Sequence, residues 1–269
     1  MKLSIITINF NNATGLYKTI ESVIKQTSND IEYILIDGGS TDGSVEVIKA
    51  FEDKISYWIS EPDNGIYQAM NKGIKAAKGD YCQFLNSGDC LVQEDVTERM
   101  LYRMPETSVL IGNMLKILPS GKCIIDNGIS NKQPTFFTFY RGTLNHSSAY
   151  IRRSLFEKYG YYDESLKIVS DWKWYLIAIG LHNEEVVYKD INVSLFDMNG
   201  ISNSSKEFLN TERRLVLEAI VPSNILVDYD RYGTGIIQMN RIKNYTATKL
   251  LFEFVERTIF YIEKIKSLF

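Results

Sequence analysis

Strand patterns and helix patterns alternate through the first third of the chain, and this alternation limits the fold more than any other feature. An apolar, β-branched run from Leu3 to Ile8 is followed by apolar residues at helical spacing from Leu16 to Ile24. Such alternation is typical of a parallel sheet covered by helices, so we expect an α/β fold. Further strands are predicted over Ile31 to Ile36, Tyr57 to Ile59 and Tyr81 to Leu85, and helices over Ser44 to Phe51 and Tyr67 to Ala77.

The rest of the chain predicts more strands and then mainly helices. Val109 to Ile125 has strand character, and Asn145 to Gly180 contains a strand, a helix beginning near Arg153 and a tryptophan-rich helix. Beyond Lys206 the pattern is mainly helical. A length of 269 residues suits one large α/β domain with a helical appendage. We therefore predict a main domain over residues 1–205 and a helical extension over residues 206–269.

Charge and cysteine content exclude several classes of protein. A net charge of -3 gives no general attraction for nucleic acid. Cys82, Cys90 and Cys123 have no metal-ligand spacing, and their odd number argues against a disulfide framework, which favours a reducing compartment. The first apolar run reaches Asn9 too soon for a signal peptide, and no uncharged apolar stretch has the ~20 residues of a spanning helix. We expect a cytoplasmic protein that does not cross a membrane by itself.

The last predicted helix is amphipathic, with basic residues interspersed among apolar ones. It could lie on a bilayer surface, which would place the protein at the inner face of the cell membrane. It could equally pack on its own domain or on a second subunit in a homodimer. The sequence leaves these alternatives open. The stripe consists of Leu251, Phe254, Val255, Thr258, Ile262, Ile265 and Phe269, and the basic residues are Lys249, Arg257, Lys264 and Lys266.

A first polar cluster follows the second predicted strand. Asp37 ends that strand and begins the segment Asp-Gly-Gly-Ser-Thr-Asp-Gly-Ser, which runs to Ser44. Ligands of open α/β sheets bind beyond the carboxyl ends of the strands, and a glycine turn beside a carboxylate leaves room for a flat nucleobase. The alternative is a tight turn in which Asp42 caps the next helix. The segment lacks the glycine pattern of dinucleotide-binding and P-loop proteins.

A second cluster extends from Glu61 to Gly73. Its acid Asp63, its glycine turn and its amphipathic helix would place Asn71 and Lys72 within a few turns of Asp63. The amide and ammonium groups suit a hydroxyl-rich, anionic ligand. The alternative is a capped surface helix.

A third cluster, Asn86-Ser87-Gly88-Asp89, follows the strand that ends at Leu85. The carboxylate of Asp89 suits a hard divalent cation that also holds phosphate oxygens. One carboxylate is enough when a diphosphate supplies other oxygens. The alternative is an ordinary loop, because such turns are common.

Together the three clusters resemble glycosyltransferase family 2, whose members have the GT-A fold. The family's T-x-x-N-like opening segment is matched by Thr7 to Asn9, and its D-G-x-S-x-D-G-(S/T) stretch by Asp37 to Ser44. Its longer E-x-D-x-G-x-x-x-A-x-N-x-G segment is matched in full from Glu61 to Gly73. The resemblance covers roughly residues 1 to 200. It implies a Rossmann-like, mostly parallel sheet flanked by helices.

The resemblance also implies roles for the donor-side residues. Asp37 should hold the nucleobase, and Thr7 and Asn9 should line the nucleoside pocket. Asp89 should bind Mn²⁺ or Mg²⁺, although the family's metal motif is typically D-x-D and Asn86 and Gly88 replace two carboxylates here. The remaining residues expected to contact the donor are Asp63, Asn71, Lys72 and Asn86.

On the acceptor side, Ser170-Asp171-Trp172 falls where the family has its base motif. Asp171 should therefore deprotonate the acceptor hydroxyl, and it could also cap the tryptophan-rich helix. His146, in a segment that resembles the acceptor-side strand, is either a satisfied core residue or a contact to pyrophosphate or acceptor. Trp172 either stacks on a sugar or packs in the core.

The family resemblance implies inverting transfer of a sugar from a nucleotide-sugar donor to a glycan or lipid-linked acceptor. UDP is the expected nucleotide, with dTDP and GDP as alternatives, and the setting would be capsule, exopolysaccharide or O-antigen synthesis. A noncatalytic nucleotide-sugar or glycan-binding module is the main rival. A nucleotidyltransferase would need a glycine-rich, basic phosphate loop, which residues 7–15 do not supply.

Overall fold

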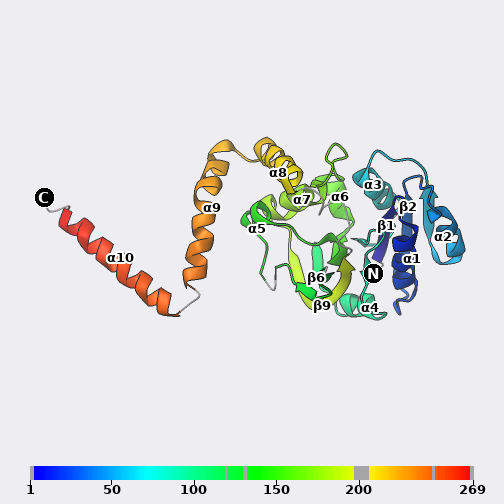
Figure 1. The fold of residues 1–269 in the computed structure, drawn as a ribbon, viewed down its shortest axis with the longest axis horizontal. Coiled ribbons are helices and arrows are strands. Elements are labelled where there is room, and N and C mark those ends of the chain that lie inside the picture. The colour runs from blue at the N-terminus through cyan, green and yellow to red at the C-terminus, as the bar shows by residue number, and fades with distance from the viewer. Residues whose placement is uncertain (1–2, 119, 130–131, 197–205, 244–245, 267–269) are drawn as a thin grey trace. The chain divides into compact units, whose positions relative to one another are not determined.

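The computed structural model describes residues 3–118, 120–129, 132–196, 206–243 and 246–266 (Figure 1). It divides into two compact units, Met1–Arg213 and Arg214–Phe269. The first unit contains the whole sheet. The domain boundary expected between residues 205 and 206 lies at the end of segment 197–205, outside the described residues, and stays a prediction.

The sheet has nine strands in the order β3-β2-β1-β4-β8-β6-β9-β5, with β7 paired to β6. Their bounds are β1 (Leu3–Asn9), β2 (Ile31–Asp37), β3 (Tyr57–Ser60), β4 (Tyr81–Phe84), β5 (Cys90–Leu91), β6 (Val109–Ile117), β7 (Cys123–Asp126), β8 (Ala149–Arg152) and β9 (Val186–Phe196). The first four strands in the sheet order are parallel, and β6 and β9 are parallel to one another. The expected α/β fold is confirmed.

Helices cover both faces of the sheet. They are α1 (Ala13–Ile24), α2 (Ser44–Ala50), α3 (Ile66–Ala76), α4 (Val96–Leu101), α5 (Phe136–Arg141), α6 (Ser154–Tyr159), α7 (Ser170–Tyr175) and the first half of α8 (Lys206–Ile220). Two short 3₁₀ helices, η1 (Glu52–Lys54) and η2 (His146–Ser148), and a π-helix, η3 (Leu176–Leu181), complete this unit. Asn12 caps α1 by accepting a hydrogen bond from the Gly15 amide. The N-cap of α7 is Val169, so the alternative in which Asp171 caps this helix was wrong.

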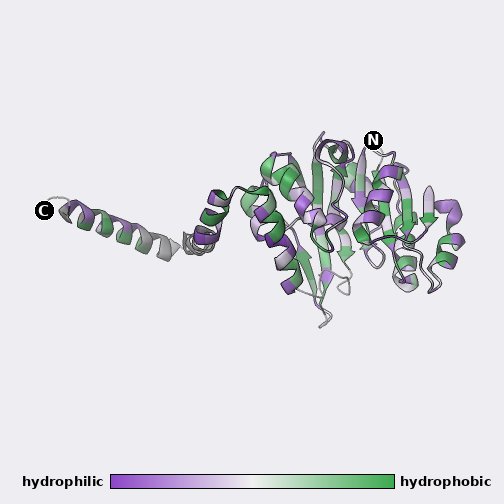
Figure 2. Ribbon diagram, turned by 90° about the horizontal axis from the view of Figure 1, so that it is seen from above, coloured by the Kyte–Doolittle hydropathy of each residue, from purple (hydrophilic) through white to green (hydrophobic). Residues whose placement is uncertain are grey.

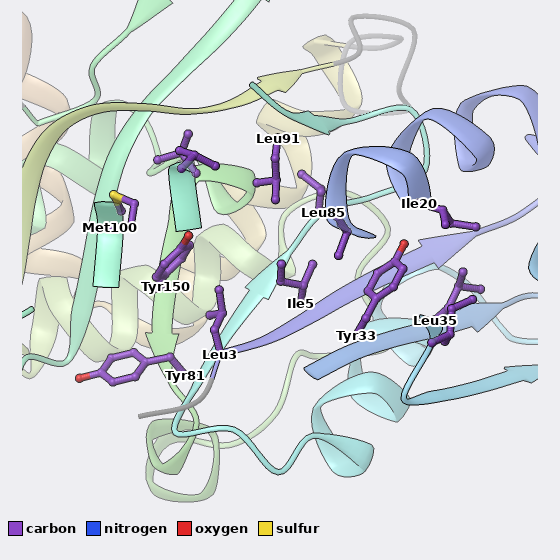
Figure 3. Close-up of a cluster of buried hydrophobic side chains, with 14 of the residues drawn as sticks. Leu3, Ile5, Ile20, Tyr33, Leu35, Tyr81, Leu85, Leu91, Met100 and Tyr150 are labelled. Carbon is purple, nitrogen blue, oxygen red and sulfur yellow. The ribbon is translucent and has the colours of Figure 1, made fainter. Parts of the chain in front are cut away.

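The core depends on β1, which is buried along its whole length. Ile5 faces Leu16 and Ile20 of α1 in one cluster, which also contains Tyr33 and Leu35 of β2 (Figure 3). Because side chains alternate along a strand, Ile6 faces the other side. There α3 packs so closely that a Cβ on Gly73 would lie 2.3 Å from Ile6 Cγ2. Apolar residues accordingly dominate the sheet in Figure 2.

Strand β8 runs antiparallel between β4 and β6, which the sequence did not predict. Its register pairs Cys82 with Ile151 and Tyr81 with Arg152. The turn η2, which precedes β8, therefore lies beside the carboxyl end of β4. There Gln83 donates a hydrogen bond of 2.6 Å to the Ser147 carbonyl. This brings His146 to the edge where the polar clusters lie.

The second unit consists of helices. They are the end of α8, α9 (Ser223–Lys243) and α10 (Thr246–Lys266). Arg214 joins α8 and α9 through an ion pair of 2.7 Å with Asp230. In the part of the chain that the structure describes, no helix is long and apolar enough to cross a membrane. Of the amphipathic stripe, Phe269 and the side chain of Ile265 lie outside the described residues, as do the side chains of Lys249 and Lys266.

Candidate functional site

Asp37 ends β2 with a fully buried carboxylate that accepts hydrogen bonds from three side chains. Asn9, its partner on β1, donates to Oδ1 at 2.7 Å. Ser40 donates to Oδ1 at 2.6 Å through its hydroxyl and to Oδ2 at 2.9 Å through its amide. Ser60 at the end of β3 donates to Oδ2 at 2.6 Å. Burial alone would raise the pKa of Asp37, but these hydrogen bonds lower it overall, so the group is an anion at neutral pH.

Thr7 lies deeper in the same part of the sheet. It is fully buried, and its hydroxyl accepts a hydrogen bond of 3.1 Å from the Tyr33 hydroxyl. Asn9 lies nearer the strand end, and its Oδ1 atom is buried without a hydrogen-bond partner in the described part of the chain. The structure thus brings Asn9 into contact with Asp37, whereas Thr7 is buried against Tyr33.

The turn after Asp37 is tied to the loop after β1. Asn11 has a left-handed backbone with φ of 48°, and its side chain accepts a hydrogen bond from the Thr41 amide at 2.9 Å. Asp42 accepts hydrogen bonds from the Ala13 amide at the start of α1 and from Ser44 at the start of α2. The carboxylate of Asp42 therefore links the starts of two helices, but the N-cap of α2 is Gly43, so the alternative in which Asp42 caps this helix was wrong.

Asp63 lies directly over the glycine turn. A Cβ on Gly38 would lie 2.7 Å from Asp63 Oδ2, so the close approach of this carboxylate requires glycine. Lys72 reaches back from α3 to form an ion pair of 2.7 Å with Glu61. The structure therefore brings Asp37, Asp63 and Lys72 to one edge of the sheet, as the sequence predicted for parallel strands.

Asn71 points away from that edge, into the protein. Its Oδ1 accepts a hydrogen bond of 3.0 Å from the Tyr162 amide. Its Nδ2 donates to the Tyr162 carbonyl at 2.8 Å and to Glu164 at 2.9 Å. Both amide hydrogens are thus engaged by the loop that leads towards Asp171. The expected donor contact of Asn71 stays a prediction.

The loop from Asn86 to Asp89 is held by α1. The Thr19 hydroxyl donates to the Asp89 carbonyl at 2.7 Å and accepts from the Gly88 amide at 2.9 Å. Asn12 donates to the Ser87 carbonyl at 3.1 Å. Asp89 itself is almost fully buried. These contacts hold the third polar cluster at the end of β4, on the opposite side of β1 from the first cluster at the end of β2.

A chain of polar contacts joins this loop to Asp171. Asn86 Nδ2 lies 3.3 Å from His146 Nε2, and His146 Nδ1 lies 3.4 Å from Asp171 Oδ2. The other carboxylate oxygen of Asp171 accepts a hydrogen bond of 3.0 Å from the Tyr67 hydroxyl. The chain thus connects β4, η2, α7 and α3. His146, which the sequence left between core and contact, lies in direct contact with the predicted base.

His146 and Asp171 each stabilise the charged form of the other. Burial alone would raise the pKa of Asp171, but the hydrogen bond and charge of His146 lower it overall. Burial alone would lower the pKa of His146, but Asp171 raises it, with a further contribution from Asp89. Asp171 is therefore ionised at neutral pH, as a general base requires.

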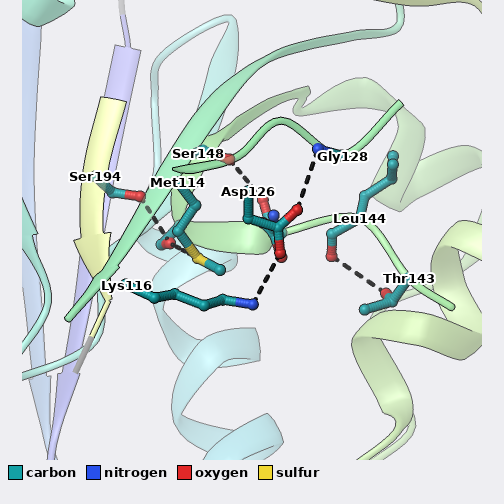
Figure 4. A network of polar contacts seen from close by, with 10 residues as sticks. Met114, Lys116, Asp126, Gly128, Thr143, Leu144, Ser148 and Ser194 are labelled. Carbon is teal, nitrogen blue, oxygen red and sulfur yellow. Dashed lines mark hydrogen bonds and ion pairs between the residues drawn. The ribbon is translucent and has the colours of Figure 1, made fainter. Parts of the chain in front are cut away.

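Side chains of other strands contact turn η2 and the residue before it (Figure 4). The Ser147 hydroxyl lies 2.9 Å from that of Ser194 on β9. Asn145 interacts with Asp126, which also accepts a hydrogen bond of 2.8 Å from Lys116. Fixed neighbours on both sides hold the His146 ring in one place.

Trp172 lies in the core and not on an open surface. It is 2% exposed, and its Nε1 donates to the Phe139 carbonyl at 2.7 Å. The Arg213 guanidinium stacks on its ring at 5.1 Å. The neighbouring Glu212 accepts hydrogen bonds from the amides of Lys167 and Ile168, directly before α7. Two residues of α8 therefore hold the segment that carries Asp171.

The sequence analysis did not predict roles for Tyr67, Thr19, Glu212 or Arg213. A role for Tyr67 could have been predicted, because it lies inside the segment from Glu61 to Gly73 and on the same face of α3 as Met70 and Ile74. The other three had no local signal, since their partners lie far away in the chain.

Among the described residues, the structure offers a single carboxylate, that of Asp89, for the predicted metal site. In the described ranges no group of three or more His, Cys, Asp or Glu side chains could hold a metal ion by itself. Asp89 is therefore the one carboxylate at the 86–89 loop, and other oxygens would have to come from a ligand. A separate cavity of about 520 Å³ contains none of the predicted residues. It is lined by Gln93, Arg99, Asn113, Ile125, Asn127, Asp190 and Asn192.

Comparison with known sequences gives matches over most of the first unit. The model of the family described as "Glycosyl transferase family 2" matches residues 4–160. An uncharacterized glycosyltransferase of Mycobacterium tuberculosis is 32% identical over 206 residues, which cover 75% of this chain and 77% of the relative.

Comparison with solved structures gives the same fold. S. aureus TarS 1-349 in complex with UDP-GlcNAc has a TM-score of 0.66 at 18% identity, covering 83% of this chain and 68% of that one. The chain spans only 40% of another TarS structure. The mannosyltransferase PcManGT from Pyrobaculum calidifontis, in complex with GDP-Man and Mn²⁺, has a TM-score of 0.60 at 11% identity, covering 93% of this chain and 82% of that one. These likenesses confirm the GT-A fold.

Proposed function

Because the chain belongs to glycosyltransferase family 2, we propose that it moves a sugar, with inversion, from a UDP-sugar to a hydroxyl of a glycan or lipid-linked acceptor in surface polysaccharide synthesis. The proposal is supported by two sets of contacts at the carboxyl ends of the parallel strands. Asn9 contacts Asp37, Asp63 covers Gly38, and Asn86 reaches Asp171 through His146. A noncatalytic binding module would not need an ionised, buried Asp171.

The donor would bind along the edge between Asp37 and Asp89. A nucleobase would lie beside Asp37, where hydrogen bonds from Asn9, Ser40 and Ser60 hold the carboxylate. UDP is the first candidate because TarS is known with UDP-GlcNAc, and GDP is the second because PcManGT is known with GDP-Man. A thermal-shift screen of UDP-, GDP- and dTDP-sugars tests this. Stabilisation by none of them would reject the proposal.

A divalent ion would be held by Asp89 and by oxygens of the donor diphosphate. A bound Mn²⁺ or Mg²⁺ supplies positive charge against the charge that grows on the departing diphosphate. Calorimetry of the selected nucleotide sugar with and without Mn²⁺ tests this. We expect tighter binding with the ion and loss of that gain in Asp89→Ala. Equal affinities in the wild-type protein would remove Asp89 from the proposal.

Asp171 would accept the proton of the acceptor hydroxyl as that oxygen bonds to the sugar. Its carboxylate is ionised, and neighbouring side chains hold it in one orientation. Asp171→Asn preserves the shape and removes the base. We expect transfer to be lost and donor affinity to stay within about twofold of wild type. Wild-type turnover in this variant would exclude the role, and slow metal-dependent hydrolysis of the donor by the wild type would distinguish an enzyme from a binding module.

Helix α10 would place the enzyme on a lipid surface, where a lipid-linked acceptor resides. Its large apolar side chains, where the structure describes them, are 44–67% exposed, and all of them except Phe260 occupy about half of the helical circumference. That arc suits an interfacial helix, whereas the seam of a two-stranded coiled coil is narrower. The exposed residues are Leu250, Leu251, Phe254, Val255, Ile259, Phe260 and Ile262. Sedimentation with phosphatidylglycerol vesicles should be lost in Phe254→Glu, and a dimer in solution without vesicle binding would contradict this part of the proposal.

A further inference from the structure

Both oxygens of the Asp171 carboxylate are engaged by side chains from other elements. Tyr67 on α3 donates to Oδ1, and His146 on η2 approaches Oδ2. Asp171 is the second residue of α7, so its own helix does not determine where the carboxylate points. Contacts from two separate elements, one on each oxygen, restrict the side chain to one orientation.

The protonation of His146 Nδ1 follows from its neighbour Asp171. This nitrogen lies 3.4 Å from Asp171 Oδ2, and a carboxylate can only accept, so Nδ1 carries a proton whether the ring is neutral or charged. His146 therefore donates from Nδ1 to the Asp171 carboxylate. A nitrogen that carries a proton and faces a carboxylate is an orienting contact, as in other histidine–carboxylate pairs.

We propose that Tyr67 and His146 are positioning residues for the base, with His146 donating from Nδ1 to Asp171 and Asn86 in contact with the other ring nitrogen. This inference rests on the proposed role of Asp171. When the acceptor oxygen bonds to the anomeric carbon, the bond from that carbon to the diphosphate breaks, and the acceptor proton goes to Asp171. Tyr67 and His146 keep their protons and hold the carboxylate towards the acceptor throughout.

A purely structural role would not require this arrangement. The ring of Tyr67 already packs against that of Tyr162 at 5.7 Å, and phenylalanine could fill the same space. A buried chain of polar groups adds no stability over apolar packing unless each member is satisfied. Arg213 on α8, with Tyr162 and Tyr175, completes the ionisable surroundings of Asp171.

Kinetics on purified variants of the full chain test the proposal. In Tyr67→Phe we expect kcat to fall on the order of tenfold, the loss of one hydrogen bond to a charged group, with unchanged donor affinity. His146→Leu should lose at least as much. His146→Asn should recover part of the loss, because its amide nitrogen occupies the position of Nδ1. His182→Gln is the control with wild-type kinetics, since His182 packs on Tyr159 instead.

A spectroscopic measurement tests the protonation of His146 Nδ1 independently of activity. The chain has two histidines, so long-range ¹H–¹⁵N spectra of the wild-type protein contain two ring systems, which His182→Gln assigns. We expect Nδ1 of His146 to carry a proton at neutral pH. An unprotonated Nδ1, or equal kcat in His146→Leu and wild type, would overturn the inference. Absence of transfer by the wild type with every nucleotide sugar would instead reject the proposed function.

Discussion

Removing the side chain of Asn71 should destabilise the loop that leads towards Asp171. This side chain joins α3 to the loop at Tyr162 and Glu164 through three hydrogen bonds. Asn71→Ala would leave the amide and the carbonyl of buried Tyr162 without these partners. Each unpaired buried group costs about 1–3 kcal/mol, so we expect a loss of roughly 3 kcal/mol in the free energy of unfolding. At about 2–4 °C per kcal/mol, the melting temperature should fall by roughly 6–12 °C.

Asn71→Asp sharpens the test, because it changes almost no volume. The carboxylate could still accept from the Tyr162 amide, but an oxygen would face the Tyr162 carbonyl and the Glu164 carboxylate in place of an NH₂ group. At neutral pH it should therefore destabilise the protein more than alanine does. Urea unfolding of both variants, with exposed Asn64→Ala as a control within about 0.5 kcal/mol of wild type, measures this. A stable Asn71→Asp variant, or unaltered stability with weakened donor binding in Asn71→Ala, would refute the reasoning.

Two further predictions concern close contacts and pH. Gly38→Ala should displace the Asp63 carboxylate, because the new Cβ would lie 2.7 Å from Oδ2, and we expect weaker donor binding in calorimetry. The control Gly142→Ala, whose Cβ would lie 3.7 Å from the nearest atom, should bind the donor normally, and equal donor affinities of the two variants would contradict the prediction. Burial alone would raise the pKa of Glu184, but hydrogen bonds, the largest from Lys158, lower this pKa to about 2. The contribution of Glu184 to stability is therefore present above pH ~4.5 and is lost as the pH falls towards 2. Glu184→Gln should flatten this part of the curve of stability against pH measured by urea unfolding, and an unchanged slope would contradict the assignment.

The sequence predicted the parallel half of the fold because the information there is local. Each strand and helix from Leu3 to Phe84 has its own hydrophobic period, and short connections leave few topologies. The location of Asp37, Asp63 and Asp89 beyond the carboxyl ends of parallel strands followed from the same geometry. The antiparallel insertion of β8 did not, because its pairing with Tyr81 depends on residues about 70 positions away.

The roles of individual side chains were predictable only where a motif specified them. Asn71 matched the family segment, yet its position depends on the loop at Tyr162, whose conformation no local pattern reveals. The contact between His146 and Asp171 likewise depends on where β8 enters the sheet. Trp172 was left between sugar stacking and core packing, and its burial and its hydrogen bond to the distant Phe139 carbonyl show that it packs in the core.

A crystal structure of the protein with UDP and Mn²⁺ tests the central claim most directly, namely that the distant polar clusters form one donor site. We expect the uracil beside Asp37 and the diphosphate at the loop that contains Asp89, with Asp171 beyond it. A nucleotide bound in the separate cavity beside Asn113, or anywhere that leaves both Asp37 and Asp89 without contact, would contradict the account.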